Sequence, residues 1–295
     1  MTHRTGSDSM GNPLRDQLAT ERGRPAFGLL PLAVPGRPSV DYAMAMIKLA
    51  LDAGVRLIDT ADIYGLQDEP LGYTERLLGD LLGHLPQEDR PIVTTKGGMV
   101  HLPSGRRGCD GRPEHLHRAC RESLRRLGTD AIDIYQLHRP DPGVPYADSL
   151  GALRELVDQG LIRGAGVDNV DAVQFDQAGA VLGDDLVLVQ NRFSVEDHTD
   201  TEVLSRCVRR GVAYAPCEPL GGLGRGSGLA ERRPALGRLA RRRNVSAQRV
   251  ALAWLLTRHP YATPVIGTSN TEHLLDALEA GHLQLSDADL EELAA

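Results

Sequence analysis

The chain has 295 residues, of which 41% are hydrophobic, and its formal net charge at pH 7 is −7. A chain of this length can bury a large core, and about 250 residues suffice for one α/β barrel. The acidic balance is unlike the basic surface of a nucleic-acid-binding protein, so we expect no nucleic-acid partner.

The first 25 residues are mostly polar and lack the apolar centre of a signal peptide. We therefore expect a flexible leader over residues 1–25 and a single catalytic domain over 26–295. No stretch reaches the roughly 20 apolar residues of a membrane-spanning helix, so we expect no membrane partner. The four cysteines lack metal-ligand spacing. They indicate free thiols in a reducing compartment, so the expected location is cytoplasmic and no metal site is expected.

Short β-branched runs alternate with longer stretches of helical periodicity along the chain. The predicted strands are residues 26–32, 55–59, 91–96, 131–138, 161–167, 185–191, 211–217 and 262–267. Strands that alternate with helices favour parallel pairing, and eight such units favour a closed (β/α)8 TIM barrel. The longest irregular segment is 97–113, and long loops in compact domains are usually functional or disordered.

One predicted helix shows the pattern clearly. Pro113 suits the first helical position, where its missing N–H costs nothing, and Gly128 supplies the stop. Apolar and small residues fall on one face at helical spacing, and the charged residues take the other face.

Polar residues follow the predicted strands at the ends where barrel enzymes build their sites. Four of them can form one catalytic group: Asp59, Tyr64, Lys96 and His138. A lysine at a barrel mouth is partly desolvated, and Asp59 on the neighbouring strand is a suitable counter-ion. Lys96 is then expected to lower the pKa of Tyr64 from about 10, so that the phenol can donate a proton. His138 is expected to hydrogen-bond a substrate oxygen. Each residue alone also has a structural explanation; the set indicates catalysis.

The segments around these residues resemble those of the aldo-keto reductase family, in its bacterial branch. The resemblance covers roughly residues 26 to 293, through GVRLIDTADIYG (54–65), TKGG (95–98), IDIYQLHRPDP (132–142), GAGVDN (164–169), VLVQNRFS (187–194) and TPVIGTSNTEHL (263–274). It implies reduction of a small aldehyde or ketone to an alcohol, with hydride from the nicotinamide C4 of NADPH and a proton from Tyr64. NADH is not excluded.

The resemblance also implies a cofactor site made of residues from four strand ends. Asn169 and Gln190, beside Asp168, would hold the nicotinamide carboxamide, next to Cys217. Pro219, Leu220 and Gly221 begin a loop whose GGLG run would approach the pyrophosphate. Residues at the start of the last barrel helix would hold the 2′-phosphate: Gly267, Thr268, Ser269, Asn270 and His273.

Three residues depart from the family pattern. Asp168 replaces a serine, Cys217 replaces an aromatic ring that stacks on the nicotinamide, and His273 stands where relatives often have arginine. Cys217 leaves the strength of cofactor binding open, and His273 leaves the preference for NADPH over NADH open. One hypothesis is that Asp168 and Glu218 favour a cationic, amine-bearing substrate.

Two other functions remain open from the sequence. One is a lyase or isomerase that uses Tyr64 and Lys96 for proton transfer, and the other is a nucleotide-binding sensor without activity. The sequence does not indicate the physiological substrate or the oligomeric state.

Overall fold

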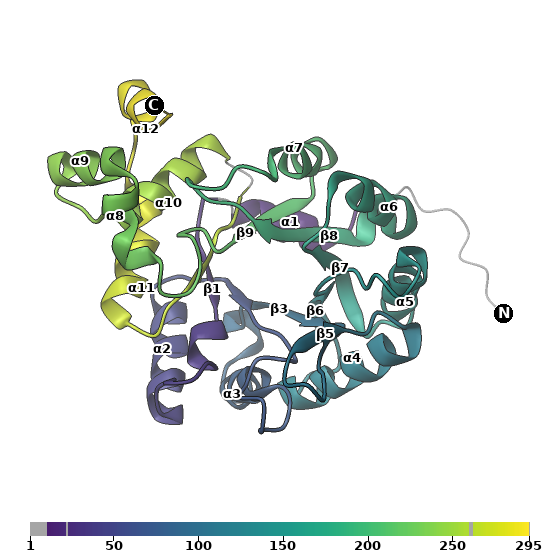
Figure 1. Cartoon of the computed structure of the whole chain (residues 1–295). Helices are drawn as coiled ribbons and strands as arrows, with labels where there is room; N and C mark the ends of the chain where they lie inside the picture. The colour runs from purple at the N-terminus through teal and green to yellow at the C-terminus, as the bar shows by residue number, and fades with distance from the viewer. Residues whose placement is uncertain (1–10, 22, 260–261, 295) are drawn as a thin grey trace.

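The computed structural model describes residues 11–21, 23–259 and 262–294. Eight parallel strands form one curled sheet, and helices surround it (Figure 1). The sheet order is β10-β1-β2-β3-β6-β7-β8-β9. The strands are β1 (Ala26–Gly28), β2 (Leu57–Asp59), β3 (Ile92–Gly97), β6 (Ile132–Leu137), β7 (Ile162–Asp168), β8 (Leu186–Arg192), β9 (Ala213–Cys217) and β10 (Val265–Gly267).

The barrel is closed by a contact between β9 and the segment that directly precedes β10. Tyr214 and Ala262 form a parallel bridge, and the backbone N–H of Thr263 donates to the carbonyl of Tyr214 at 2.9 Å. The predicted (β/α)8 barrel is therefore confirmed. The first strand is shorter than predicted, because Pro31 lacks the N–H that a strand ladder needs, and Leu30–Leu32 forms a 3-10 turn instead.

Helices follow the strands along the outside of the barrel. They are α1 (Pro13–Thr20), α2 (Val40–Asp52), α3 (Tyr73–Leu82), α4 (Pro113–Leu127), α5 (Tyr146–Asp158), α6 (Ala172–Leu182), α7 (Thr201–Arg210), α8 (Leu229–Arg232), α9 (Pro234–Arg243), α10 (Ala247–Arg258), α11 (Thr271–Leu278) and α12 (Asp287–Ala294). In α4 the predicted boundaries are confirmed, since Gly128 ends the helix with a φ of 64°. Within the described ranges, every helix is too short or too polar to cross a bilayer.

The barrel strands are buried on both faces, which is typical of parallel sheets covered by helices. In β8, for example, the four successive residues from Leu186 to Val189 are all buried. One face points into the barrel and the other packs under the helices. This rigid wall fixes the direction in which each strand end presents its polar residues.

The prediction of a flexible leader is wrong between Pro13 and Thr20, which form α1. Asn12 caps this helix, and Leu14 and Leu18 lie on one face four residues apart. Both leucines pack on apolar residues of the barrel strands, including Leu57 and Val187, and are buried there. Helix α1 thus covers apolar side chains of the barrel strands that would otherwise be exposed to solvent. Residues 1–10 lie outside the described residues, and the expected domain boundary at residue 26 stays a prediction.

Replacing Leu18 by alanine should lower the free energy of unfolding by about 2 kcal/mol, through lost burial and the cavity that remains. Urea denaturation measures this change. The control is Val173→Ala on α6, which is 66% exposed and should change stability by less than about 0.5 kcal/mol. Equal stability of Leu18→Ala and wild type would mean that α1 does not rest on the barrel in solution.

Segment 97–113 is more regular than predicted. It contains a two-stranded antiparallel hairpin, β4 (Met99–His101) and β5 (Arg107–Cys109). The hairpin starts directly after β3, because Gly98 turns the chain with a φ of 94° that side-chain-bearing residues rarely adopt. It therefore begins at the carboxyl-terminal end of the barrel.

Candidate active site

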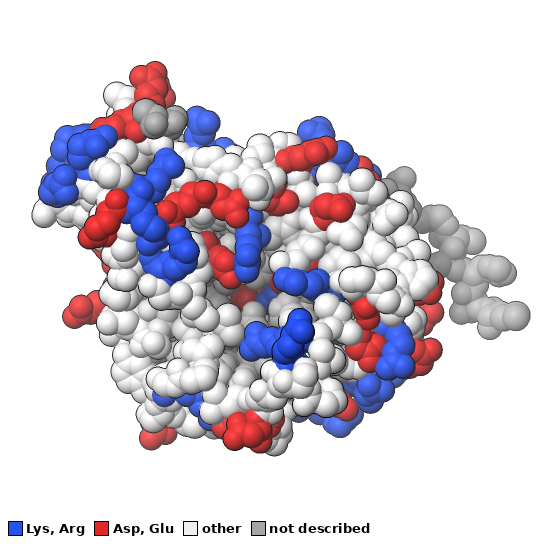
Figure 2. Space-filling model, in the orientation of Figure 1, with Lys and Arg blue, Asp and Glu red and all other residues white. Residues whose placement is uncertain are grey.

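The carboxyl ends of the barrel strands bring the predicted site residues to one end of the barrel. The strand register places Gly267 beside Gly28 and Gly28 beside Asp59, and it places Asp168 beside Gln190. Figure 2 shows the molecule in the same orientation as Figure 1, with a hollow near the centre of the face and charged side chains around it. We refer to this end as the mouth.

Lys96 and Asp59 form a buried ion pair at the mouth. The Lys96 Nζ lies 2.6 Å from Asp59 Oδ1 and donates a second hydrogen bond to the carbonyl of Thr60 at 3.0 Å. Burial by itself lowers the pKa of Lys96, but the neighbouring carboxylate of Asp59 outweighs this effect, so that the pKa lies above its ordinary value. Lys96 is therefore a permanent cation at neutral pH.

Tyr64 lies between this pair and His138. The Lys96 Nζ is 5.5 Å from the centroid of the Tyr64 ring, and the Tyr64 and His138 rings meet edge to face with centroids 6.0 Å apart. The expectation of a lowered Tyr64 pKa is wrong for this structure. Burial raises the pKa of the phenol above its ordinary value, and the charge of Lys96 offsets only part of that rise. Tyr64 is thus fully protonated at neutral pH, as a proton donor must be.

His138 is a neutral imidazole. Burial lowers its pKa well below the ordinary value, and the charges of Lys96, Arg107 and Arg139 lower it further. Among the described residues, neither ring nitrogen has a hydrogen-bond partner, and Nδ1 is fully buried. The ring is therefore free to hydrogen-bond an oxygen that enters the mouth.

Asp168, Asn169 and Gln190 lie together at the ends of β7 and β8. The Asn169 amide group donates to Asp168 Oδ1 at 2.8 Å and to the carbonyl of His138 at 3.2 Å. These bonds use its N–H groups and leave its oxygen to accept. Gln190 is already engaged by the protein, since its Oε1 accepts from Gln136 at 3.0 Å and its Nε2 lies 3.5 Å from Asp59 Oδ2. Asn169 is the better placed of the two amides to meet a ligand.

The acidic pair predicted to attract a cationic substrate carries little free charge. Burial raises the pKa of Asp168 to about 8, although Lys96 and Arg139 oppose the shift. Asp168 is then mostly a neutral acid at pH 7. Glu218 is paired with Arg192, whose Nε lies 3.1 Å from Glu218 Oε2. The structure therefore argues against the hypothesis of an amine-bearing substrate.

Cys217, Pro219, Leu220 and Gly221 lie at the end of β9 and in the loop that follows. Burial raises the pKa of the Cys217 thiol well above its ordinary value, so it is not a reactive thiolate. The loop turns sharply, with positive φ angles at Gly221 (92°), Gly222 (103°) and Gly224 (75°). Only glycine adopts such a path freely, and the missing side chains allow close approach to the backbone. The N–H of Gly221 already donates to the carbonyl of Glu218 at 2.8 Å.

Gly267, Thr268, Ser269, Asn270 and His273 lie at the end of β10 and the start of α11. The side chain of Asn270 caps α11 by accepting from the backbone N–H of His273 at 3.0 Å, and Thr268 Oγ1 accepts from the N–H of Asn270 at 3.1 Å. Ser269 and His273 are exposed. This helix start is open to solvent on the same side of the barrel as Asp59.

Two residues inside the barrel were missed by the sequence analysis. Gln136 donates to Thr94 Oγ1 at 2.7 Å and to Gln190 at 3.0 Å, so that it links β3, β6 and β8 beneath the site. The signal was present, because Gln136 precedes His138 by two residues and Thr94 precedes Lys96 by two. Residues spaced by two along a strand share a face, which here is the inside of the barrel.

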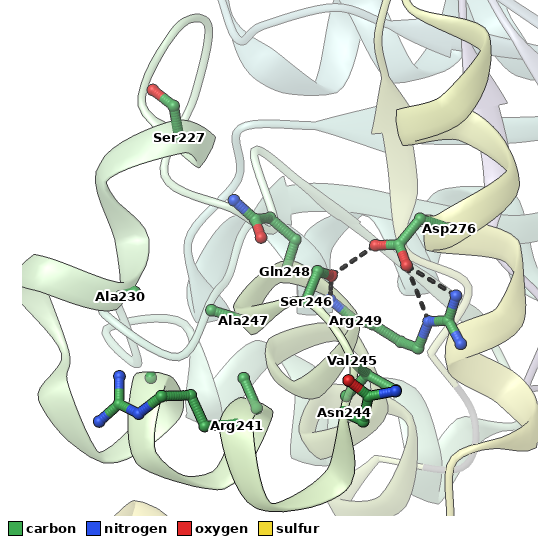
Figure 3. A pocket seen from close by; sticks show the side chains of 12 residues that line it. Ser227, Ala230, Arg241, Asn244, Val245, Ser246, Ala247, Gln248, Arg249 and Asp276 are labelled. Atoms are coloured by element: carbon green, nitrogen blue, oxygen red, sulfur yellow. Dashed lines mark hydrogen bonds and ion pairs between the residues drawn. The ribbon is translucent and has the colours of Figure 1, made fainter.

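A separate surface cavity of about 580 Å³ lies between α8–α9 and the start of α10 (Figure 3). An ion pair between Arg249 and Asp276 borders it, with Arg249 Nη2 2.7 Å from Asp276 Oδ1, and Ser246 donates to the same carboxylate. None of Asp59, Tyr64, Lys96 and His138 lines this cavity. Among the described residues, no cluster of His, Cys, Asp or Glu could hold a metal ion.

The fold and the site define the class of protein as a barrel oxidoreductase. The model of the aldo/keto reductase family matches residues 26–295, so the chain belongs to that family, and the resemblance found in the sequence is confirmed.

Named relatives and solved structures agree with this membership. The chain is 32% identical over 289 residues to pyridoxine 4-dehydrogenase of Escherichia coli, which covers 92% of this chain and 93% of the relative. It is 32% identical over 267 residues to a 6-dehydroglucose reductase of Novosphingobium aromaticivorans, covering 86% and 85%. An aldo/keto reductase from Klebsiella pneumoniae, solved with NADP and acetate, has a TM-score of 0.76 at 26% identity, covering 92% and 93%.

Proposed function

We propose that the mouth reduces an aldehyde or ketone to an alcohol, with Tyr64 as the proton donor and NADPH as the cofactor. The observation that carries the proposal is the buried Lys96–Asp59 pair beside Tyr64 and His138. Family membership and the NADP complex of the Klebsiella relative support it. No observation favours the lyase or isomerase alternative.

The residues at the mouth fit a dinucleotide. The free oxygen of Asn169 would accept from the carboxamide, the glycine-rich loop after Cys217 would lie along the pyrophosphate, and the open start of α11 would meet a phosphate. The nicotinamide ring of the dinucleotide, when bound, supplies the hydride. His273 is exposed at the start of α11, and the preference for NADPH over NADH is part of the proposal.

The chain itself handles the proton and the carbonyl oxygen. His138 would hydrogen-bond the oxygen and place it near the Tyr64 hydroxyl. Tyr64 would transfer its proton to that oxygen as negative charge develops there. The phenolate left behind would be stabilised by Lys96, and Asp59 keeps Lys96 in place and charged.

The proposal is tested by mixing the protein with NADPH and a panel of small aldehydes and following the absorbance of the reduced cofactor. A parallel fluorescence titration compares NADPH with NADH. Consumption of the cofactor that depends on the aldehyde supports the proposal. Tight nucleotide binding without turnover would instead favour a sensor, and absence of nucleotide binding would contradict the cofactor assignment.

Asp168 should make the choice between oxidised and reduced cofactor depend on pH. Its pKa of about 8 means that it gains a negative charge as the pH rises from 7 to 9. A carboxylate beside the nicotinamide favours the positively charged oxidised ring over the neutral reduced ring. The ratio of the Kd for NADP⁺ to the Kd for NADPH should therefore fall, by up to about tenfold.

The matched variant is Asp168→Asn, which keeps the shape and cannot ionise. Its Kd ratio should stay flat between pH 7 and pH 9 when both constants are measured by fluorescence titration. An equal slope in wild type and Asp168→Asn would show that another group is responsible.

A further inference from the structure

Two arginines at the mouth remain without an acidic partner after the ion pairs are assigned. Lys96 is paired with Asp59, and Arg192 is paired with Glu218. Among the described residues, no ion pair is found for Arg107 or Arg139. The mouth therefore presents two guanidinium groups that make no ion pair with a carboxylate of the described residues.

Both arginines flank the same side of the site. Arg107 begins β5 in the hairpin that follows β3, and Arg139 directly follows His138 at the end of β6. Both are exposed, and both charges act on the His138 ring. Figure 2 shows basic side chains gathered beside the hollow, on the side where Figure 1 places β5 and β6.

The two carboxylates that follow these arginines closely in the chain, Asp110 and Asp141, already have other partners. Asp110 is held by Arg112, with Nη2 2.7 Å from Asp110 Oδ2. Asp141 accepts hydrogen bonds from the backbone N–H groups of Gly111 at 2.9 Å and Gly143 at 2.8 Å. An exposed arginine is ordinarily a solvated surface group. Arg107 and Arg139 differ because both lie near enough for their charges to act on the imidazole that would hold the substrate carbonyl.

We propose that the substrate carries a carboxylate or a phosphate besides its carbonyl group, and that Arg107 and Arg139 bind this anionic group. The proposal rests on carbonyl reduction at this mouth. Guanidinium groups suit the role because their paired N–H donors match the oxygens of a carboxylate or phosphate. The two arginines are thus specificity-determining residues and do not touch the reacting atoms.

The test uses pairs of carbonyl compounds that differ in the anionic group. One pair is 4-oxobutanoate and butanal, and the other is glyceraldehyde 3-phosphate and glyceraldehyde. Turnover is followed by NADPH absorbance at low and high NaCl. We expect at least one anionic member to exceed its neutral partner about tenfold in kcat/KM at low salt, and the advantage to shrink as salt screens the charges. Which pair responds distinguishes a carboxylate from a phosphate.

The variants are Arg107→Gln and Arg139→Gln, with Arg106→Gln as the matched control. Arg106 is the neighbouring exposed arginine of the hairpin and is not among the charges that act on His138. Each test variant should raise KM for the anionic compound about tenfold and leave the neutral partner within about twofold. The control should leave both unchanged.

Three results distinguish failure of the anionic-substrate proposal from failure of the proposed carbonyl reduction. Equal kcat/KM within both pairs at low salt would overturn the anionic-substrate proposal while leaving carbonyl reduction intact. A preference for the anionic member that persists unchanged in both arginine variants would also overturn it. Failure of the wild type to reduce any of the four compounds would contradict carbonyl reduction itself.

Discussion

Replacing Tyr64 by phenylalanine should lower kcat for carbonyl reduction by a factor of about 10²–10⁴, which is the range that general acid catalysis contributes. The reason is that Tyr64 lies beside both Lys96 and His138, and its raised pKa keeps the proton available at neutral pH. The affinity for NADPH should stay within about twofold, because the lost hydroxyl is assigned to the carbonyl oxygen. Steady-state kinetics and a fluorescence titration measure the two quantities.

The control for this variant is Tyr73→Phe. Tyr73 begins α3, and its ring lies under Arg37 at 3.9 Å from the guanidinium carbon. Tyr73→Phe removes the same phenolic hydroxyl as Tyr64→Phe, but a short distance from the site, so kcat should change less than about twofold. A wild-type rate in Tyr64→Phe, or an equal loss in both variants, would remove Tyr64 from the proton-donor role.

Replacing Lys96 by methionine should destabilise the protein by about 3–5 kcal/mol, since it leaves the buried Asp59 without its counter-ion. This is a large share of the roughly 5–15 kcal/mol that holds a domain folded. The loss should be smaller at pH 5 than at pH 8. Burial already raises the pKa of Asp59, and without Lys96 the carboxyl can be neutralised by a proton as the pH falls.

The matched control is the double variant Asp59→Asn with Lys96→Met, which removes both charges. It should be more stable than Lys96→Met alone, because no uncompensated charge remains in the barrel. Urea denaturation at both pH values measures the difference. If Lys96→Met alone has the same free energy of unfolding as the wild type, the Lys96–Asp59 pair is not buried in solution.

The sequence predicted the barrel, and it predicted that the candidate catalytic residues lie together at one end of it, because both depend on local patterns. β-branched runs and helical periodicity gave the alternation of strands and helices, and the residue after each run gave the strand ends. Asp59, Lys96 and His138 were found in this way. The hairpin at β4–β5 and helix α1 were missed, although Asn12, Pro13 and the spacing of Leu14 and Leu18 carried the signals of a capped helix.

The electrostatics of the site were harder to predict from the sequence. The sign of the Tyr64 pKa shift depends on how completely the ring is buried, and the free charge of Glu218 depends on its ion pair with Arg192. In the same way, Arg107 and Arg139 lack ion pairs within the described part of the molecule because other groups bind the carboxylates that lie close to them in the chain. Such facts follow only from three-dimensional packing.

The central claim is that Lys96 acts on the reaction through Tyr64. A double-mutant cycle of kcat/KM with Tyr64→Phe, Lys96→Met and the combined variant tests it most directly, with each rate taken from single turnover at saturating NADPH. If the claim holds, the combined variant is less than about threefold slower than Tyr64→Phe alone, since the lysine has no phenol left to assist. Losses that multiply would show that the two residues act independently, and would contradict the account.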